Sequence, residues 1–317
     1  MIKSIKVTNY TGDSIKLVLG EPERSGFLIK SITGLGPVKA TINTTKITTG
    51  DGSLYNSARS DDRNIVMDIV FVDSVNHESI EDLRQKSYKY FPLQKNVELI
   101  IETDNRIVKT IGYVESNEPD IFSKQENTKI SILCPDPYFY SVKEENVTNF
   151  YTIEPMLEFP FSNELVDGVE GDSGEEIVST ANIILSSIHM KAEGCLTYTG
   201  DIETGVEIYI HAIGPASGIN IYNIDTRESM RIDTTKLEAI IGSGIMVSDD
   251  IVITTTKGMK TIKFIRYGVS YNIINCLDRK SDWFTISKGS NRFGFTADSG
   301  STNLQFKIKN KVVYEGV

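Results

Sequence analysis

The chain has 317 residues, of which 39% are hydrophobic and 24% charged, a composition typical of a soluble globular protein. At roughly 150 residues per domain, this length predicts two domains. The formal net charge of -10 argues against a nucleic-acid binder of the ordinary basic type, and no apolar run approaches the roughly 18 residues of a membrane span.

The N-terminus and the cysteines bear on the compartment in which the chain is made. The first residues, MIKSIKVTNY, have no apolar stretch of the kind found in a secretory signal. The three cysteines, Cys134, Cys195 and Cys276, are scattered and odd in number, which favours reduced thiols over a disulfide framework. The sequence therefore predicts synthesis in a cytoplasm.

Residues 40–64, ATINTTKITTGDGSLYNSARSDDRN, are rich in threonine and poor in large apolar side chains. Gly50, Asp51, Gly52 and Ser53 form a turn signal between two flanks that favour strand. One interpretation is a polar surface hairpin. The other is an arm that reaches a neighbouring subunit, because a hairpin that buries nothing at home is marginally stable alone.

A buried strand and a helix follow this hairpin. NIVMDIVFV, residues 64–72, is apolar on nearly both faces, as in a central strand. A helix is predicted over 77–91, with Asn76 as its cap and Pro92 as its end. Its proposed apolar face consists of Ile80, Leu83, Ser87, Tyr90 and Phe91.

The segment ISILCPDPYFYS, residues 130–141, predicts the exit from a first domain. Cys134 continues the inward alternation of Ile130 and Ile132, so it is expected to be a buried structural thiol. Pro135 and Pro137 prevent further ladder pairing. The three aromatic residues that follow, 138–140, are expected to pack over the end of that domain.

An acidic stretch lies between the two halves of the chain. Residues 144–176 hold 10 acids and no lysine or arginine. Within it, DGVEGDSGEE resembles a calcium loop but fails the EF-hand template, since Val169 and Gly171 stand where ligands are required. A solvated loop is therefore expected at 167–176.

The second half again predicts many short strands, which is typical of sandwiches and barrels. The clearest is LQFKIK, in which Leu304, Phe306 and Ile308 alternate with polar residues. IIGSGIM, residues 240–246, is interpreted as a tight turn between strands. The other strand patterns in this half are VEIYIHAI, IVITTT, TIKFIRY and FGFTA.

Candidate catalytic and metal-binding residues are few. His77, His189 and His211 each lack a second histidine or a cysteine at ligand spacing. The nucleophile elbow, the phosphate-binding loop and the dinucleotide fingerprint are all missing from the sequence. We therefore expect no enzyme activity, no metal and no cofactor.

Segments spread along the chain resemble the distal tail proteins of long-tailed phages that infect Gram-positive bacteria. In the first half they are YNSARSDDRNIVMDIVF, IEDLRQKSYKYFPLQKNVELIIETDNR, GYVESNEPDIFSK and ISILCPDPYFYS. In the second half they are PMLEFPFSNE, YTGDIETGVEIYIHAIG, INIYNIDTRESMRID, DDIVITTTKGMKTI and SDWFTISKGSNRFGFTADSG. The order and spacing of these segments, over nearly the whole chain, make the resemblance specific.

The resemblance implies a mainly β protein. Its N-terminal β domain has one helix and a hairpin arm, and its C-terminal domain is a galectin-like or carbohydrate-module-like β-sandwich. The implied boundaries are 1–141 for the ring-forming domain, 142–176 for an acidic linker or insert, and 177–317 for the sandwich. The insert, 162–176, is a departure from the shorter members of the family.

The resemblance also implies a role at the virion tail tip. A homo-hexamer would form a ring on the tail tube protein, with arms crossing subunit boundaries, and act as a hub for tail-tip, baseplate and receptor-binding proteins. DNA would only pass through the bore, and no membrane anchor is expected. At the subunit interface we place the turn Gly50–Ser53, together with Arg59 and Arg63, whose neighbours Asp61 and Asp62 suggest intersubunit ion pairs.

Two other functions remain open from the sequence. The C-terminal half could be a carbohydrate-binding module that contacts the host surface, although the single tryptophan, Trp283, better suits a core or edge position. The chain could also be a tail-associated hydrolase, which would need a catalytic constellation that the sequence does not display.

Overall fold

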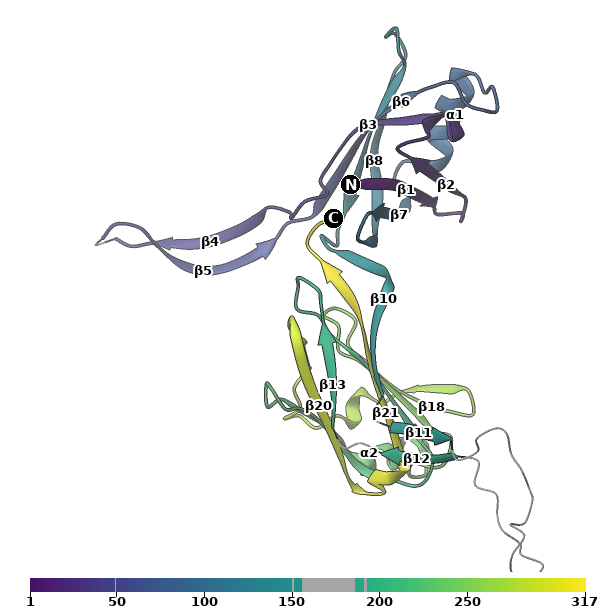
Figure 1. The fold of residues 1–317 in the computed structure, drawn as a ribbon. Helices are drawn as coiled ribbons and strands as arrows, with labels where there is room; N and C mark the ends of the chain where they lie inside the picture. The colour runs from purple at the N-terminus through teal and green to yellow at the C-terminus, as the bar shows by residue number, and fades with distance from the viewer. Residues whose placement is uncertain (49, 150, 156–185, 191–192) are drawn as a thin grey trace, which may run out of the picture.

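A computed structural model describes residues 1–48, 50–149, 151–155, 186–190 and 193–317. The chain is mainly β, as predicted. It has an N-terminal region (residues 1–138) and a C-terminal region (residues 139–317), joined by a narrow connection (Figure 1). The long hairpin β4–β5 projects sideways from the N-terminal region.

The elements of the N-terminal region are β1 (Ile2–Asn9), β2 (Ser14–Val18), β3 (Phe27–Thr33), β4 (Ala40–Lys46), β5 (Ser53–Ser60), β6 (Arg63–Phe71), α1 (Ile80–Tyr90), β7 (Asn96–Thr103), β8 (Ile107–Asp120) and β9 (Asn127–Cys134). The elements of the C-terminal region are β10 (Phe139–Asn149), β11 (Tyr151–Pro155), β12 (Ser186–Met190), β13 (Glu193–Tyr198), β14 (Glu207–Ala212), β15 (Ser217–Asn223), β16 (Ser229–Ile232), α2 (Thr234–Ile241), β17 (Asp250–Thr254), β18 (Thr261–Arg266), β19 (Val269–Asn272), β20 (Gly289–Ser299) and β21 (Leu304–Tyr314).

Two leaves of sheet that share the long strand β8 form the N-terminal region. One leaf has the order β2-β1-β7-β8, and the other has the order β8-β9-β6-β3. The register of β8 against β9 shifts between Val114 and Ser116. Such a bulge bends a strand, which lets β8 pass from one leaf to the other. β6 is a central strand, as its two apolar faces predicted.

The helix α1 is shorter than predicted and has a different cap. Asn76 does not cap it. Instead Ser79 Oγ accepts a hydrogen bond from the Asp82 amide at 3.1 Å, and Asp82 accepts one from the Ser79 amide at 3.2 Å. This reciprocal capping box satisfies two free amides, whereas His77 has a left-handed φ of 53° and is not helical. Ile80, assigned to the buried face, is 44% exposed.

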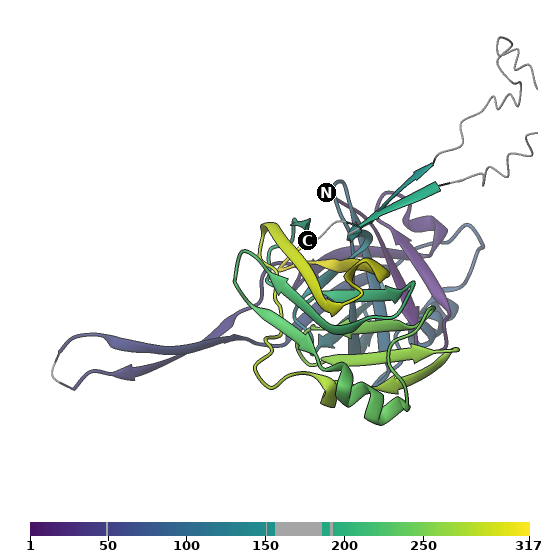
Figure 2. The same cartoon turned by 90° about the horizontal axis from the view of Figure 1, so that it is seen from below.

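The C-terminal region is a two-layer β-sandwich (Figures 1 and 2). One layer has the order β19-β18-β17-β14-β21-β10, and the other has the order β13-β20-β15-β16. Phe295 of β20 stacks on Phe306 of β21, with ring centroids 3.7 Å apart. Leu304, Phe306 and Ile308 are buried, which confirms the alternation predicted for β21. The galectin-like character of the sandwich stays a prediction.

The second helix, α2, was not predicted. Asp233 caps its start by accepting hydrogen bonds from the amides of Thr235 and Lys236. Gly242 ends it with a left-handed φ of 85°, a common helix terminator. The interpretation of residues 240–246 as a turn between strands was therefore wrong, because the segment begins in the last turn of this helix.

A short stretch of β10 and β21 connects the two regions, and we call it the neck (Phe139–Ser141 and Val313–Tyr314). Phe139 pairs with Tyr314, and Ser141 pairs with Val108 of β8. One sheet therefore continues from the C-terminal sandwich into the N-terminal region. Phe139 is buried at the exit of the N-terminal region, as is Cys134, and both placements confirm predictions.

The predicted acidic linker, 142–176, is described only in part. Residues up to Asn149 belong to β10, which pairs with β21, and Tyr151–Pro155 form β11, which pairs with β12. Residues 156–176, including the predicted solvated loop, lie outside the described residues. The division into domains at residues 141 and 177 stays a prediction.

Candidate assembly surface

The arm (residues 40–60) is a long hairpin whose strands are exposed along their whole length. β4 and β5 pair with each other alone, and every residue of both strands is exposed. Among them are Ile42, 61% exposed, Leu54, 60%, and Tyr55, 67%. Because these apolar side chains stay exposed, they gain no hydrophobic stabilisation within this chain. The hairpin predicted from the sequence is confirmed, and its surface is free to contact a partner.

The two faces of the arm differ in polarity. Ile42 lies opposite Ala58, and Thr44 lies opposite Tyr55. Directly opposed residues of an antiparallel pair share a face, and side chains alternate between faces along each strand. Ile42, Tyr55 and Ala58 therefore project from one face, which we call the apolar face of the arm, while Arg59 lies on the other.

The register of the arm is fixed by polar side chains. Asn43 donates to Ser57 Oγ at 3.1 Å, and Asn56 donates to Thr45 Oγ1 at 2.7 Å. A register shift at Thr44 accompanies these bonds. Cross-strand pairs contribute only about 0.2–1 kcal/mol each, so the arm is a weakly stabilised ribbon with a defined register.

The predicted turn residues lie at the free end of the arm (Figure 1). Gly52 has a φ of 94°, a conformation that glycine adopts without steric cost. The Ile47 amide donates to the Gly52 carbonyl at 3.5 Å across the turn. Gly50, Asp51 and Ser53 are exposed beside it.

Arg59 is at the surface, as its predicted interface role requires. Its side chain is 79% exposed, and its Nε lies 3.8 Å from Asp61 Oδ1 of the same chain. The hydroxyl of Thr41 also donates to the Asp61 carboxylate, whose two oxygens lie 2.9 and 2.8 Å from Oγ1. Such an exposed pair contributes little, so Arg59 is available to a partner at small cost.

Arg63 is buried, and the intersubunit ion pair predicted for it is wrong in this fold. Its exposure is 0%. Its guanidinium donates to the carbonyls of Pro137 at 2.7 Å, Gly34 at 2.5 Å, Gly36 at 2.7 Å and Glu315 at 2.6 Å. Burial lowers the pKa of Arg63 from its ordinary value. The side chain is directed inward, where four carbonyls from segments remote in sequence accept its hydrogen bonds.

A second projection was missed in the sequence. Strands β8 and β9 extend beyond the N-terminal region as a hairpin (Figure 1), and near its tip Phe122 is 95% exposed and Ile121 is 44% exposed. The turn is ordered by Ser123 Oγ, which donates to the Gln125 carbonyl at 2.6 Å. The available signal was an apolar pair between the polar residues Asp120 and Ser123.

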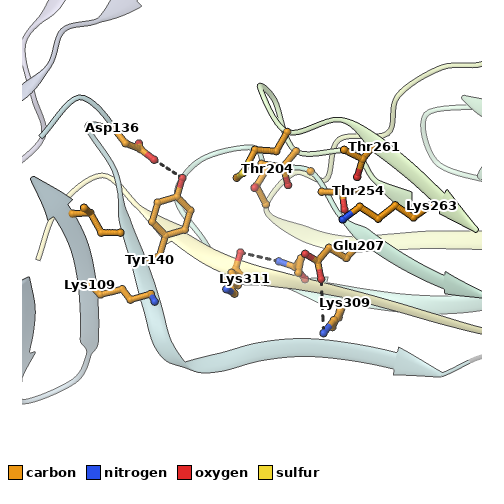
Figure 3. A pocket seen from close by; sticks show the side chains of 15 residues that line it. Lys109, Asp136, Tyr140, Thr204, Glu207, Thr254, Thr261, Lys263, Lys309 and Lys311 are labelled. Carbon is orange, nitrogen blue, oxygen red and sulfur yellow. Dashed lines mark hydrogen bonds and ion pairs between the residues drawn. The ribbon is translucent and has the colours of Figure 1, made fainter. Parts of the chain in front are cut away.

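A cleft of about 680 Å³ opens between the two regions (Figure 3). Tyr140 lines it and donates to Asp136 at 2.7 Å, and burial raises the pKa of Tyr140. Lysines and threonines make up most of its polar lining, namely Lys109, Lys263, Lys309, Lys311, Thr204, Thr254, Thr256 and Thr261. The hydroxyl, ammonium and carboxylate groups of this lining can donate and accept hydrogen bonds.

The remaining candidate residues are separated in space. His211 Nδ1 lies 2.6 Å from Asp250 Oδ1 on the outer face of the sandwich, and the side chain of His189 is outside the described residues. Trp283 packs against the core, with Lys260 Nζ 5.1 Å from its ring centroid. This placement fits the expected core or edge position better than an open sugar platform.

The residues that the structure describes contain no group of three or more His, Cys, Asp or Glu side chains positioned to hold a metal ion. Within the same residues, no helix is both long enough and apolar enough to cross a membrane.

The fold has solved counterparts among phage tail proteins, although no protein-family model and no curated protein sequence matches the chain. The Dit protein of phage SPP1, described as a paradigm of the hub adsorption apparatus in phages that infect Gram-positive bacteria, is similar with a TM-score of 0.61. The two are 12% identical, and the match covers 98% of each chain.

Two structures of the phage P2 baseplate in its activated conformation are also similar, with lower scores. The structure with Ca is 15% identical with a TM-score of 0.46, and the structure with Sr is 14% identical with a TM-score of 0.43. Both matches cover 98% of this chain. By its similarity to the SPP1 protein over 98% of both chains, this chain has a Dit-like fold.

Proposed function

We propose that this chain is a structural distal tail protein of a long-tailed phage or a phage-derived particle. In this role it forms a hexameric ring that joins the tail tube to the tail tip or baseplate and to receptor-binding proteins. The observation that carries the proposal is the match to SPP1 Dit over 98% of both chains. A match of that extent includes the arm and the sandwich, so it concerns the whole architecture.

The arm supports the proposal because it offers a surface for contact between subunits. A ring closes when each subunit presents one surface to the next in a head-to-tail manner. The apolar face of the arm, with Ile42 and Tyr55 exposed, is one such surface that the chain itself leaves uncovered. Docking on the next subunit would bury it and also cover the two free edges of the hairpin. Arg59 would fix the register of the contact more than its strength.

A hub of this kind needs no catalysis, and we propose that the protein is not an enzyme. DNA would pass through the bore without binding, since an acidic protein gains no counterion-release affinity for it. The protein would be made in the bacterial cytoplasm and located at the virion tail tip. The acidic character of the chain, with a net charge of -10, supports passage of DNA without binding.

We also propose three segments: a ring-forming domain (1–141), an acidic linker (142–176) and a sandwich domain (177–317). The composition of residues 144–176, with 10 acids and no basic residue, supports a protease-sensitive boundary. A Glu-directed protease should cut there first and leave two resistant pieces. First cuts within 95–135 would contradict this division.

The ring is tested by native mass and electron microscopy, with and without tail tube. Because the tube can template the ring, purified tubes are added at several protein concentrations and salt concentrations. The proposal predicts hexameric rings at tube ends. A chain that stays monomeric and leaves tube ends bare would refute it.

A pair of variants tests the arm contact inside that assay. Replacing Ile42 and Tyr55 by Ser removes the apolar face and should weaken the ring. Leu54→Ser, on the opposite face and equally exposed, is the matched control and should assemble as the parent does. Equal assembly by all three proteins would mean that the apolar face is not the contact.

The second candidate is a carbohydrate-binding tail protein. The hydroxyl- and ammonium-lined cleft of about 680 Å³ favours it, since such groups hydrogen-bond sugars and their phosphates. Binding to an array of host-wall glycans that is lost in Thr254→Val would support this function. No binding to any glycan would remove it.

A further inference from the structure

Both ends of the arm meet at the guanidinium of Arg63. Arg63 is the first residue of β6 and follows the end of β5 by three positions, so it lies at the base of the returning leg of the arm. Its Nη1 donates to the carbonyls of Gly34 and Gly36, which lie just before β4 and so belong to the outgoing leg. One buried side chain therefore joins the two legs where they leave the N-terminal region.

The same guanidinium binds the C-terminus of the chain. Its Nη2 donates to the Glu315 carbonyl at 2.6 Å. Two residues later, the Val317 amide donates to the Leu35 carbonyl at 3.1 Å. The last residues of the chain thus lie along the outgoing leg of the arm, held by one side-chain bond and one backbone bond.

The close fit of the outgoing leg depends on glycine. Gly34 has a φ of 84°, and a Cβ there would lie 2.0 Å from the Asn64 carbonyl oxygen. A Cβ on Gly316 would lie 3.1 Å from the Leu35 carbonyl oxygen. Gly34 therefore lies tightly against β6, and Gly316 lies close against the outgoing leg.

Arg63 also contacts the neck. Its Nε donates to the Pro137 carbonyl at 2.7 Å, and its Cζ lies 4.2 Å from the ring centroid of Phe139. Phe139 pairs with Tyr314, whose ring has Arg106 Cζ at 4.2 Å. A planar, five-donor group is suited to gather several carbonyls at once while stacking on a ring, which lysine cannot do.

We propose that Arg63 and the C-terminal residues 315–317 form a lock that sets the direction of the arm relative to the N-terminal region and couples it to the neck. Arg63 is thus a positioning residue for the arm. The proposal concerns the single chain, so it holds or fails independently of ring formation.

Distances between spin labels test the lock. The exposed Cys195 is first replaced by Ser, and labels are placed at Lys46→Cys in the arm and Lys6→Cys in β1, both exposed positions. Labelled protein is diluted with unlabelled protein so that only distances within one chain are measured. Thermal unfolding is recorded in parallel to detect general loss of stability.

The variants are Arg63→Gln, Arg63→Lys and deletion of Val317. All three should broaden or shift the distance distribution, and deletion of Val317 should do so with little change in melting temperature because Arg63 keeps its bonds. Arg59→Gln in the exposed arm is the matched control and should leave the distribution unchanged, while Val317→Ala keeps the backbone bond and should behave as the parent.

The outcomes separate positioning from stability alone. If Arg63→Gln does not fold, Arg63→Lys and the Val317 deletion decide the question. An unchanged distribution in both would refute the lock, even if melting temperatures fall. An unchanged distribution in the Val317 deletion alone would remove the C-terminus from it. Broadening in Arg59→Gln equal to that in Arg63→Lys would also refute it.

Discussion

Two antiparallel hairpins of this protein have opposite surroundings. In the arm, ATINTTK pairs with SLYNSARS, and both strands are exposed throughout. In the sandwich, β17 (DIVIT) pairs with β18 (TIKFIR), and their alternate residues are buried. Two large apolar residues share the buried face of each sandwich strand, whereas no face of an arm strand carries more than one.

The two hairpins are stabilised in different ways. The β17–β18 hairpin is stabilised by burial in its own chain, where Ile253 and Ile262 are opposed and fully buried. The cross-strand pairs of the arm are all exposed, so its apolar residues are buried only when a partner covers them. Matched substitutions in the two hairpins test this difference in stabilisation.

The largest expected effect is from isoleucine truncation. Ile262→Ala leaves a cavity in the sandwich and should lower the free energy of unfolding by about 2–5 kcal/mol. Ile42→Ala in the arm, where the side chain is 61% exposed, should change it by less than about 0.5 kcal/mol. Chemical denaturation measures both. A cost of similar size at Ile42 would mean that the arm packs against its own chain.

Substitution of one arginine in each hairpin should give a smaller difference in the free energy of unfolding. Arg266 of β18 binds the buried Asp249 through two nitrogens, at 2.8 and 2.6 Å. Arg266→Gln would leave that carboxylate short of partners and should cost about 3 kcal/mol. Arg59→Gln in the arm should cost no more than about 1 kcal/mol. Equal costs in denaturation would contradict the account of the two hairpins.

The smallest effect is expected within the arm. Asn43→Ala removes the hydrogen bond to Ser57 and should destabilise the hairpin alone, by about 0.2–1 kcal/mol. Hydrogen exchange should quicken at arm amides and stay unchanged in β17 and β18. Faster exchange in the sandwich would show that the two parts are energetically coupled.

What the sequence predicted well depended on local patterns. β21, β6 and the arm follow from the alternation, or lack of alternation, of apolar residues over a few positions. The end of α1 before Pro92 follows from the chemistry of proline. Such features need no knowledge of distant segments.

The errors arose where distant segments decide the outcome. Asp61 and Asp62 suggested a surface position for Arg63, but its carbonyl partners come from residues 34, 36, 137 and 315. α2 was missed because only Thr234 and Leu237 of its eight residues are buried, which gives a weak helical pattern. Asn76 was chosen as a cap over Ser79, although the pair Ser79 and Asp82 carried the stronger signal.

Removal of the arm tests the central claim most directly. Residues 44–58 are deleted and the ends are joined by a short turn, which keeps the base of the arm and Arg63. Melting temperature and ring formation on tail tubes are then measured on the same sample. The account predicts a melting temperature equal to that of the parent and a loss of rings. A deletion protein that forms rings as well as the parent, or one that unfolds far below it, would contradict the claim that the arm serves assembly and not the fold.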